Sequence, residues 1–262
     1  MKRTTDDQKL MRDVITYYKK HGRHDLPWRH NISSYRILVS EIMLQQTQVK
    51  RVLPKFVIWM TQYPTLQKLS QSNLREVLVL WQGLGYQRRA KALLQIAKEY
   101  RSLPKTFDEL LKLPGIGVYT ASALCAFAYD SFSHPVLETN IRTLLIEYFH
   151  QGETSVHDGL LYDDLSRLEQ YRPVQRLGAR AWYYALMDFG AHLKENKISH
   201  NTRSFHYKQQ SLYKGSFREL RARALFAITH GHPLPEDERL SRALSELVRE
   251  GFITKQGDGY LV

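Results

Sequence analysis

The first candidate for chemistry is a glutamate beside an apolar run. Glu41 stands in "SEIMLQQTQV", residues 40–49, which has the composition of a helix. A carboxyl group half buried against apolar neighbours has its pKa raised by desolvation, so it can act as a general acid near neutral pH. Three side chains that suit the edges of nucleic-acid bases follow it: Gln45, Gln46 and Gln48. The simpler interpretation, which these residues alone favour, is an exposed polar face of a helix.

A glycine turn is the second candidate. "LPGIGVYTA", residues 113–121, predicts one helix that ends at Leu113 and another that starts near Tyr119. Gly115 and Gly117 allow the backbone to approach a ligand closely. The start of the second helix adds unpaired N–H groups and a positive dipole end, which together suit a phosphate oxygen. The alternative is an ordinary turn between two helices.

Two further groups allow two interpretations each. Glu138 stands just before a predicted helix in "HPVLETNIRTL", where the helix dipole stabilises an anion, and plain helix capping explains it as well. Tyr86 follows a Gly-Leu-Gly turn in "WQGLGYQRRAKAL", with Arg88 and Arg89 behind it. An aromatic side chain on such a loop can wedge between bases and stack there. A buried tyrosine beside two solvated arginines is the alternative.

The charge of the chain points to a polyanionic partner. Its 262 residues include 38 Lys and Arg against 26 Asp and Glu, a net charge of +12. Nucleic acid is the common partner of such a chain, although a merely basic protein has the same balance. One cysteine, Cys125, cannot hold a metal ion or a cluster by itself. Because no signal peptide and no apolar span of about 18 residues is visible, we expect a cytoplasmic, nucleoid-associated protein without a membrane partner.

The elements that would position these residues are mostly helices. Apolar residues at helical spacing and capping signals predict helices within residues 6–23, 33–53, 72–86, 87–103, 106–113, 119–130, 139–150, 162–171 and 176–194. Gly22 lies past the end of the first helix, and the segment 72–86 ends in a glycine turn. We therefore predict a helical domain over residues 1–194 and a linker over 195–215. Residues 216–262 predict two helices and a β-hairpin around Gly257-Asp258-Gly259, which is the order of a small winged-helix module.

Five segments occur in the order expected of one enzyme family: "LPWRHNISSYRILVSEIMLQQTQV", "WQGLGYQRRAKAL", "LPGIGVYTASALCAFAY", "NIRTL" and "ALMDFGA". Over about residues 10–193 the chain resembles adenine DNA glycosylases of the MutY type, which belong to the helix-hairpin-helix superfamily that includes endonuclease III. The resemblance implies a mostly α, two-lobed helix-hairpin-helix glycosylase fold with DNA in the cleft between the lobes. The small winged-helix-like α+β module would follow it.

The resemblance also implies roles for catalytic residues. Glu41 would protonate N7 of a flipped adenine, and Glu138 stands where the family places an aspartate near the developing sugar cation. The longer side chain moves that carboxylate by about 1 Å or more, which can lower a rate ~100-fold. Asn140 matches a supporting asparagine. Tyr119 stands where the bifunctional branch carries a lysine, and because tyrosine forms no Schiff base, we expect a monofunctional enzyme.

Other matches concern DNA and the base pocket. Gln46 matches a glutamine wedged into the duplex, and Tyr86 matches an intercalating tyrosine. Trp28 and Arg29 match positions near the adenine pocket. The DNA-binding residues that we expect are Gln45, Gln46, Gln48, Tyr86, Arg88, Gly115 and Gly117.

The sequence departs from the family in two further places. Lys194 takes the first of four positions at which the family usually carries cysteines, and no cysteine follows it. We therefore expect no iron–sulfur cluster, no other metal and no cofactor. Residues 216–262 are too short for the C-terminal domain that helps the family to read 8-oxoguanine opposite the adenine.

These observations predict a monofunctional DNA glycosylase of base excision repair that removes adenine mispaired with 8-oxoguanine or guanine. We expect it to act as a monomer on double-stranded DNA with a mismatched or oxidised base pair. A thymine or uracil mismatch glycosylase on the same scaffold would share the tyrosine at position 119, although we do not expect it to keep "MLQQTQV". A non-catalytic protein that binds mismatched or damaged DNA would fit the glutamate at position 138 and the missing cluster cysteines.

Overall fold

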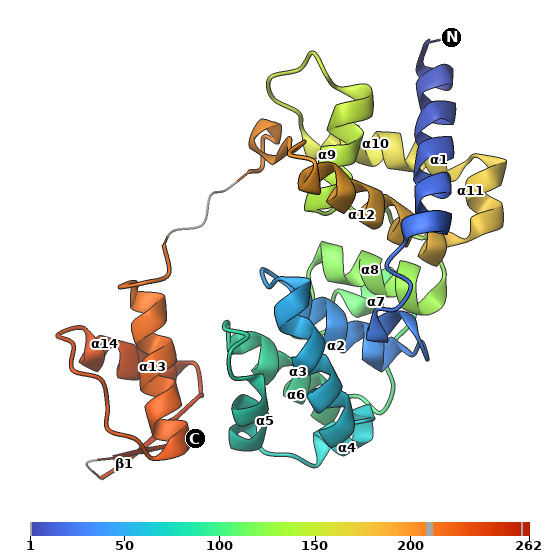
Figure 1. Cartoon of the computed structure of the whole chain (residues 1–262). Coiled ribbons are helices and arrows are strands. Elements are labelled where there is room, and N and C mark those ends of the chain that lie inside the picture. The colour runs from blue at the N-terminus through green and yellow to red at the C-terminus, as the bar shows by residue number, and fades with distance from the viewer. Residues whose placement is uncertain (1, 208–211, 258) are drawn as a thin grey trace. The chain divides into compact units, whose positions relative to one another are not determined.

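The chain folds into helices joined by short connections, with one small hairpin near its end (Figure 1). The computed structural model describes residues 2–207, 212–257 and 259–262. Two compact units each combine segments that are distant in the sequence: unit 1 is Met1–Glu41 with Leu103–Lys208, and unit 2 is Ile42–Ser102 with Gln209–Val262. The predicted mostly α class is confirmed. Within the described ranges, no helix has the length and apolar character needed to cross a membrane.

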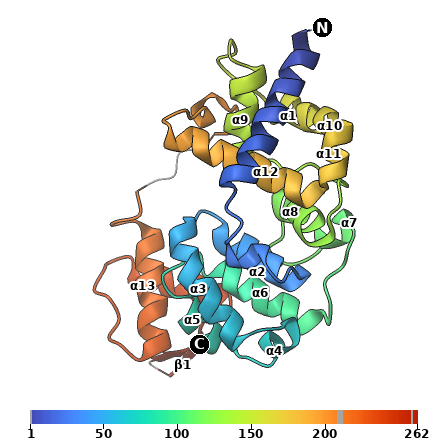
Figure 2. The same ribbon diagram turned by 45° about the vertical axis from the view of Figure 1, so that its right-hand side comes forward.

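Unit 1 is built around α12 (Ala179–Glu195), which buries Trp182 and Tyr183 completely. Its helical neighbours, visible in Figure 2, are α1 (Lys2–His21), α8 (Val118–Tyr129) and α9 (Thr139–Phe149). The other elements of unit 1 are η1 (Pro27–Arg29), most of α2 (Ser34–Leu44), α7 (Phe107–Leu110), α10 (Asp158–Glu169), α11 (Arg172–Leu177) and η2 (Asn201–Arg203).

The contact between α9 and α12 depends on a glycine. A Cβ atom at Gly190 would lie 2.2 Å from the backbone oxygen of Asn140. No side chain fits at that distance, so the two backbones come together only because residue 190 has none. This close approach holds the start of α9 against α12.

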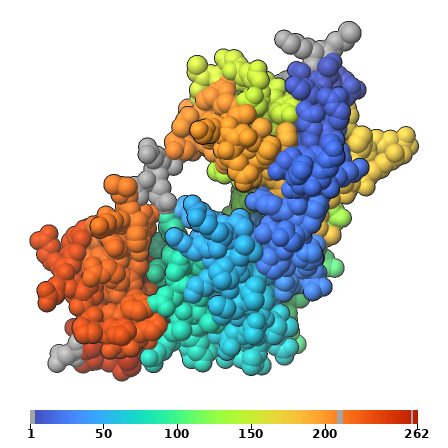
Figure 3. Space-filling view, in the orientation of Figure 1, coloured from blue at the N-terminus to red at the C-terminus, as the bar shows by residue number. Residues whose placement is uncertain are grey.

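Unit 2 consists of a helical part, residues 42–102, and a C-terminal part that lies against it (Figure 3). Phe56, Trp59 and Trp81 form a fully buried core, and the rings of the two tryptophans meet nearly at right angles, 5.5 Å apart. The elements of unit 2 after α2 are α3 (Val49–Gln62), α4 (Leu66–Ser70), α5 (Leu74–Trp81), α6 (Arg88–Glu99), α13 (Phe217–His230), α14 (Leu240–Arg249), β1 (Thr254–Gln256) and β2 (Gly259–Leu261).

Residues 216–262, predicted as a module of their own, belong to unit 2. Arg75 on α5 donates to the carbonyl oxygen of Thr229 on α13 at 3.0 Å. Arg88 on α6 forms a paired ion contact with Glu250, with N–O distances of 2.9 and 2.5 Å. The two predicted helices and the antiparallel strand pair are present, although residue 258 of the hairpin lies outside the described residues.

The predicted linker, residues 195–215, follows unit 1 over its first part. Glu195 still belongs to α12, and Ser204 forms a β-bridge with Val156. Residues 208–211 lie outside the described residues. The boundaries of the compact units therefore differ from the predicted boundaries at 194 and 215.

One predicted helix is wrong. Residues 33–53 form two helices, α2 and α3, separated by residues 45–48. Gln46 has a φ of +53°, in the left-handed region where a right-handed helix cannot continue. The guanidinium of Arg89 supports the break, because it donates to the carbonyl oxygen of Ile42 at 2.8 Å and to further carbonyl oxygens at the end of α2. This contact spans 47 residues of sequence and is invisible to local pattern.

Candidate active site

Glu41 is almost fully buried in the last turn of α2, with 4% of its surface exposed. The hydroxyl of Tyr119, in the first turn of α8, donates to its Oε2 at 2.8 Å. Burial raises the pKa of Glu41 from its ordinary value of 4.5 to about 7, and the charge of Glu138 adds to the rise, while the Tyr119 hydrogen bond and Arg29 oppose it. A carboxyl group with this pKa is partly protonated at neutral pH, as a general acid requires.

The side chains of two tyrosines interact electrostatically with the carboxyl group of Glu41. Burial, with the nearby charges of Glu41 and Glu138, holds the pKa of Tyr119 well above its usual range, so Tyr119 stays a neutral hydrogen-bond donor. Burial also raises the pKa of Tyr184 on α12, and Glu41 is the first of the charges that add to this rise. The Tyr184 hydroxyl is buried and has no hydrogen-bond partner within the described part of the chain. Sequence reasoning missed Tyr184, because nothing in "AWYYALMDFGA" distinguishes it from a core aromatic residue.

Glu138 and Asn140 meet at the start of α9. Glu138 is the N-cap residue, and its Oε1 accepts hydrogen bonds from the backbone N–H groups of Asn140 at 2.7 Å and Ile141 at 2.9 Å. Its Oε2 accepts from Nδ2 of Asn140 at 3.2 Å. The capping interpretation is therefore correct. It is compatible with an electrostatic role, because the charge of Glu138 also acts on Glu41.

Lys194 lies one helical turn after Gly190 on α12, so it projects from the face that meets the start of α9. Its side chain is half-buried. Burial lowers the pKa of Lys194, and the charge of Glu138 opposes that fall. Lys194, at the position where the resemblance implies a cluster cysteine, therefore lies close enough to Glu138 for the two charges to interact.

Trp28 and Arg29 lie on η1, where Trp28 is buried and the side chain of Arg29 is 5% exposed. Arg29 makes a two-pronged ion pair with Asp188 of α12, with N–O distances of 2.7 and 2.9 Å, and its guanidinium lies 4.1 Å from the ring centre of Tyr184. Burial acts to raise the pKa of Asp188, but Arg29 and Arg23 outweigh it and hold that pKa below its usual range. Arg29 therefore anchors η1 to α12. Nothing in the segment "ALMDFGA" by itself indicates a role for this aspartate.

The glycine turn lies between α7 and α8, as predicted. Gly115 has a φ of +75°, and Gly117 is the N-cap residue of α8. Both are exposed, and a Cβ atom added at Gly117 would meet nothing within 4 Å. The backbone at the start of α8 is therefore open to a phosphate group.

The glutamines belong to unit 2 and do not continue the helix of Glu41. They form the turn between α2 and α3, in which Gln46 and Gln48 are exposed and Gln45 is half-buried. Gln48 is the N-cap position of α3. The alternative interpretation, an exposed polar helix face, is therefore wrong, and the exposed turn in its place presents the Gln46 side chain from a left-handed backbone.

The Gly-Leu-Gly-Tyr turn also has left-handed backbone, at Gly83, Gly85 and Tyr86, with φ values of +86°, +69° and +49°. A left-handed tyrosine is uncommon and is typical of functional sites. The Tyr86 hydroxyl accepts a hydrogen bond at 2.7 Å from Arg218 of α13. Arg89 donates to the carbonyl oxygens of this turn as well as to those of α2, and burial lowers its pKa to about 10. Arg89 thus ties together the two segments predicted to enter DNA.

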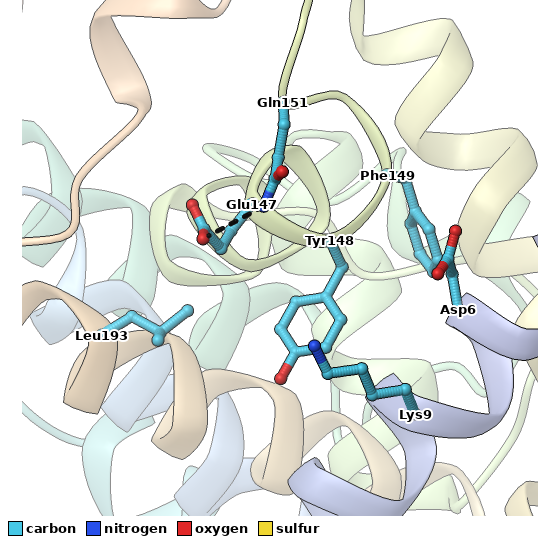
Figure 4. Close-up of a pocket in the computed structure, with 7 residues that line it drawn as sticks. All are labelled: Asp6, Lys9, Glu147, Tyr148, Phe149, Gln151 and Leu193. Carbon is cyan, nitrogen blue, oxygen red and sulfur yellow. Dashed lines mark hydrogen bonds between the residues drawn. The ribbon is translucent and has the colours of Figure 1, made fainter.

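The described residues contain no cluster of three or more His, Cys, Asp or Glu side chains that could hold a metal ion. Cys125 is buried within α8, and a cluster with four thiolate ligands does not fit a chain with one cysteine. Unit 1 also has a hollow of about 570 Å³ that contains none of the predicted site residues (Figure 4). Lys9 and Tyr148 face each other there, with the ammonium 5.7 Å from the ring centre.

Residues 39–183 match the family model of the HhH-GPD superfamily base excision DNA repair proteins. The chain belongs to this superfamily. It is 36% identical over 187 residues to the adenine DNA glycosylase of Buchnera aphidicola subsp. Schizaphis graminum, covering 68% of this chain and 52% of that protein. It is 45% identical over 144 residues to the adenine DNA glycosylase of Mycolicibacterium smegmatis, covering 53% of this chain and 48% of that protein. The chain spans about half the length of these curated relatives.

A solved structure of a thermostable thymine-DNA glycosylase is similar to this fold, with a TM-score of 0.61 over 73% of this chain and 88% of that one. The two sequences are 20% identical, which shows a shared fold. The predicted helix-hairpin-helix glycosylase fold and the resemblance to adenine DNA glycosylases are confirmed.

Proposed function

We propose that this protein is a monofunctional DNA glycosylase that hydrolyses the N-glycosidic bond of adenine mispaired with 8-oxoguanine or guanine. The observation that carries the proposal is the buried Glu41, whose pKa is raised to about 7 and whose Oε2 accepts a hydrogen bond from Tyr119. The identity of 36–45% with adenine DNA glycosylases supports adenine as the base.

The proposed reaction uses both protonation states of Glu41. The protonated carboxyl group gives its proton to N7 of the flipped adenine, and the bond between N9 and C1′ breaks with its electron pair on the base. The carboxylate that remains orients a water molecule, whose oxygen adds to C1′ while its proton returns to Glu41. Flipping costs a few kcal/mol and least at a mismatch, which contributes to selectivity.

Glu138 would stabilise the sugar cation between these steps. Its carboxylate accepts a hydrogen bond at the start of α9, and its charge raises the pKa of Glu41. Tyr119 remains neutral in this scheme, because burial holds its pKa well above its usual range. Its side chain is a phenol and offers no amine for a Schiff base, which supports simple hydrolysis without a lyase step.

The experiment is single-turnover base release from duplexes with adenine opposite 8-oxoguanine or guanine, with thymine and uracil opposite guanine as controls. We expect adenine release by the wild type and none by Glu41→Gln, with DNA binding retained. Release of thymine or uracil in place of adenine would assign the chain to the mismatch glycosylases that act on those bases.

A second candidate function is non-catalytic binding of mismatched DNA. The observation that favours it is that both oxygens of Glu138 are occupied by its own helix start and by Asn140. Tight mismatch binding with no release of any base, by wild type and Glu41→Gln alike, would establish it.

Three further properties belong to the proposal. We expect a monomer that works without an iron–sulfur cluster, since Lys194 replaces the first ligand and one cysteine is present in all. We expect it in the cytoplasm with the nucleoid, where its substrate is. Iron analysis of the purified protein should find less than a tenth of an equivalent, and base release should be unaffected by an iron chelator.

A further inference from the structure

Unit 2 contains a groove between α13 and the turn at residues 82–87. Its volume is about 780 Å³, within the ~300–1,000 Å³ of ligand-binding pockets. One wall comes from α3 and the turn, and the other from α13 and the residues just before it. The groove lies outside the Glu41 site, and the proposed base-release chemistry does not use it.

The groove is lined with positive charge. Arg51 and Lys55 of α3 face it, and so do Arg218 and Arg223 of α13. No aspartate or glutamate occurs among its lining residues in the described part of the chain. Four cations without a carboxylate favour a polyanion over a peptide of mixed charge.

Aromatic side chains stand beside these cations. Tyr213 is 51% exposed and Phe226 is 38% exposed, although both line a concave surface. The guanidinium of Arg218 lies 5.5 Å from the ring centre of Tyr86 and 5.6 Å from that of Tyr213. Exposed rings next to arginines are the usual platform for an unstacked base.

The turn leaves room for a backbone to approach. A Cβ atom added at Gly85 would meet nothing within 4 Å. The opposite wall is held in place, because Arg218 donates to the Tyr86 hydroxyl and Arg75 donates to the carbonyl oxygen of Thr229. Glu250 further ties this wall to Arg88 of α6.

We propose that this groove extends the DNA interface expected around Gln46 and Tyr86, which also line it, and that the C-terminal part of the chain supplies its other wall. It would hold one nucleotide of the bound strand, with the phosphate against Arg51 and Arg223 and the base against Tyr213 and Phe226. The inference rests on the proposed function, since it assumes that the chain works on DNA, and it gives residues 212–262 a role in binding.

The test is fluorescence anisotropy with a labelled duplex that carries one adenine–guanine mismatch, using the full chain in a Glu41→Gln background. The double variant Arg51→Ala/Arg223→Ala removes two exposed cations. Its slope of log K against log salt should be shallower by about 1, because the two arginines share one phosphate and each phosphate contact contributes ~0.9. Tyr213→Ala should weaken binding at least about fivefold, which corresponds to ~1 kcal/mol of stacking.

Arg249→Ala is the matched control, because Arg249 is an exposed cation of α14 that does not line the groove. Its affinity and salt slope should equal those of the parent. Urea unfolding of every variant shows whether the fold is kept. Unchanged affinity and slope in both groove variants would overturn the proposal.

Adenine release by proteins with Glu41 intact separates the two proposals. If the wild type binds DNA through the groove and releases no base, the proposed chemistry fails and the groove assignment is supported. If adenine is released but the groove variants bind like the parent, the groove assignment alone fails.

Discussion

Ionisation of the buried Glu41 should make the folded protein less stable, and the substitution Glu41→Gln should reveal by how much. In the unfolded chain this carboxyl group has its ordinary pKa of 4.5, whereas in the folded protein its pKa is about 7. The folded state therefore holds the proton more tightly. The free energy of unfolding must fall as the pH rises from ~4.5 to ~7, and the loss is complete above pH 7.

The magnitude follows from the two pKa values. At ~1.4 kcal/mol per pKa unit, ionising Glu41 costs about 3 kcal/mol of stability at pH 8 and about 1 kcal/mol at pH 5. The side chain is 4% exposed, so solvent screens little of this. Glutamine has nearly the same shape, keeps an oxygen for the Tyr119 hydroxyl and does not ionise. The gain in stability from Glu41→Gln should therefore be about 2 kcal/mol larger at pH 8 than at pH 5.

Urea unfolding of wild type and variant at the two pH values measures this difference. Glu169→Gln is the matched control, because Glu169 is a second buried carboxyl group that accepts a hydrogen bond from a tyrosine, Tyr183, and burial raises its pKa too. The gain in stability of Glu169→Gln over the wild type should also grow as the pH rises, but this variant should keep full base release. A gain from Glu41→Gln that is the same at pH 5 and pH 8, within ~0.5 kcal/mol, would refute the account of Glu41 as a proton donor held by burial.

Three more substitutions test the surroundings of the site. Tyr119→Phe removes a hydrogen bond that favours the carboxylate of Glu41, so the pKa of Glu41 should rise by about one unit. The alkaline limb of the pH profile of the single-turnover rate should move to higher pH by the same amount, and an unmoved limb would contradict this. Glu138→Asp should keep or raise the rate of adenine release, by up to ~100-fold, with stability within ~1 kcal/mol, since aspartate also caps helices well; a large loss would mean that the backbone of α9 suits the longer side chain. Arg89→Lys should lower the free energy of unfolding by about 3 kcal/mol in urea melts, because an ammonium cannot reach the carbonyl oxygens of both α2 and the turn at residues 82–87. A change under ~1 kcal/mol would mean that other contacts hold the break after α2.

The longer helices followed from the sequence because their signals are local. The apolar spacing over residues 139–150 and the acid before it predicted α9, and the structure places α9 at Thr139–Phe149 with Glu138 as its cap. Two unpredicted α-helices, α4 (Leu66–Ser70) and α11 (Arg172–Leu177), span about one turn and a half each. A pattern with a 3.6-residue repeat does not emerge in so short a segment.

The residues of the candidate site divide in the same way, into those that local motifs identify and those that depend on distant partners. The residue types at positions 41, 119, 138 and 140 were identified from motifs, and the structure brings these four together in unit 1. Arg89, Tyr184 and Asp188 were missed as site residues. Their roles depend on partners that lie tens of residues or more away along the chain, and no local pattern records such partners.

The sequence by itself determined which groups are available: one acid after an apolar run, a tyrosine at position 119, glycines where the backbone must turn left-handed, and one cysteine. Tertiary structure alone decided what those groups can do. The pKa of Glu41 rises because segments from elsewhere in the chain exclude water from it, with Tyr119 donating across 78 residues of sequence. Tyr86 is joined to Arg218 across 132 residues, which creates the basic groove. Desolvation and charge proximity are properties of packed space, so they appear only when the chain has folded.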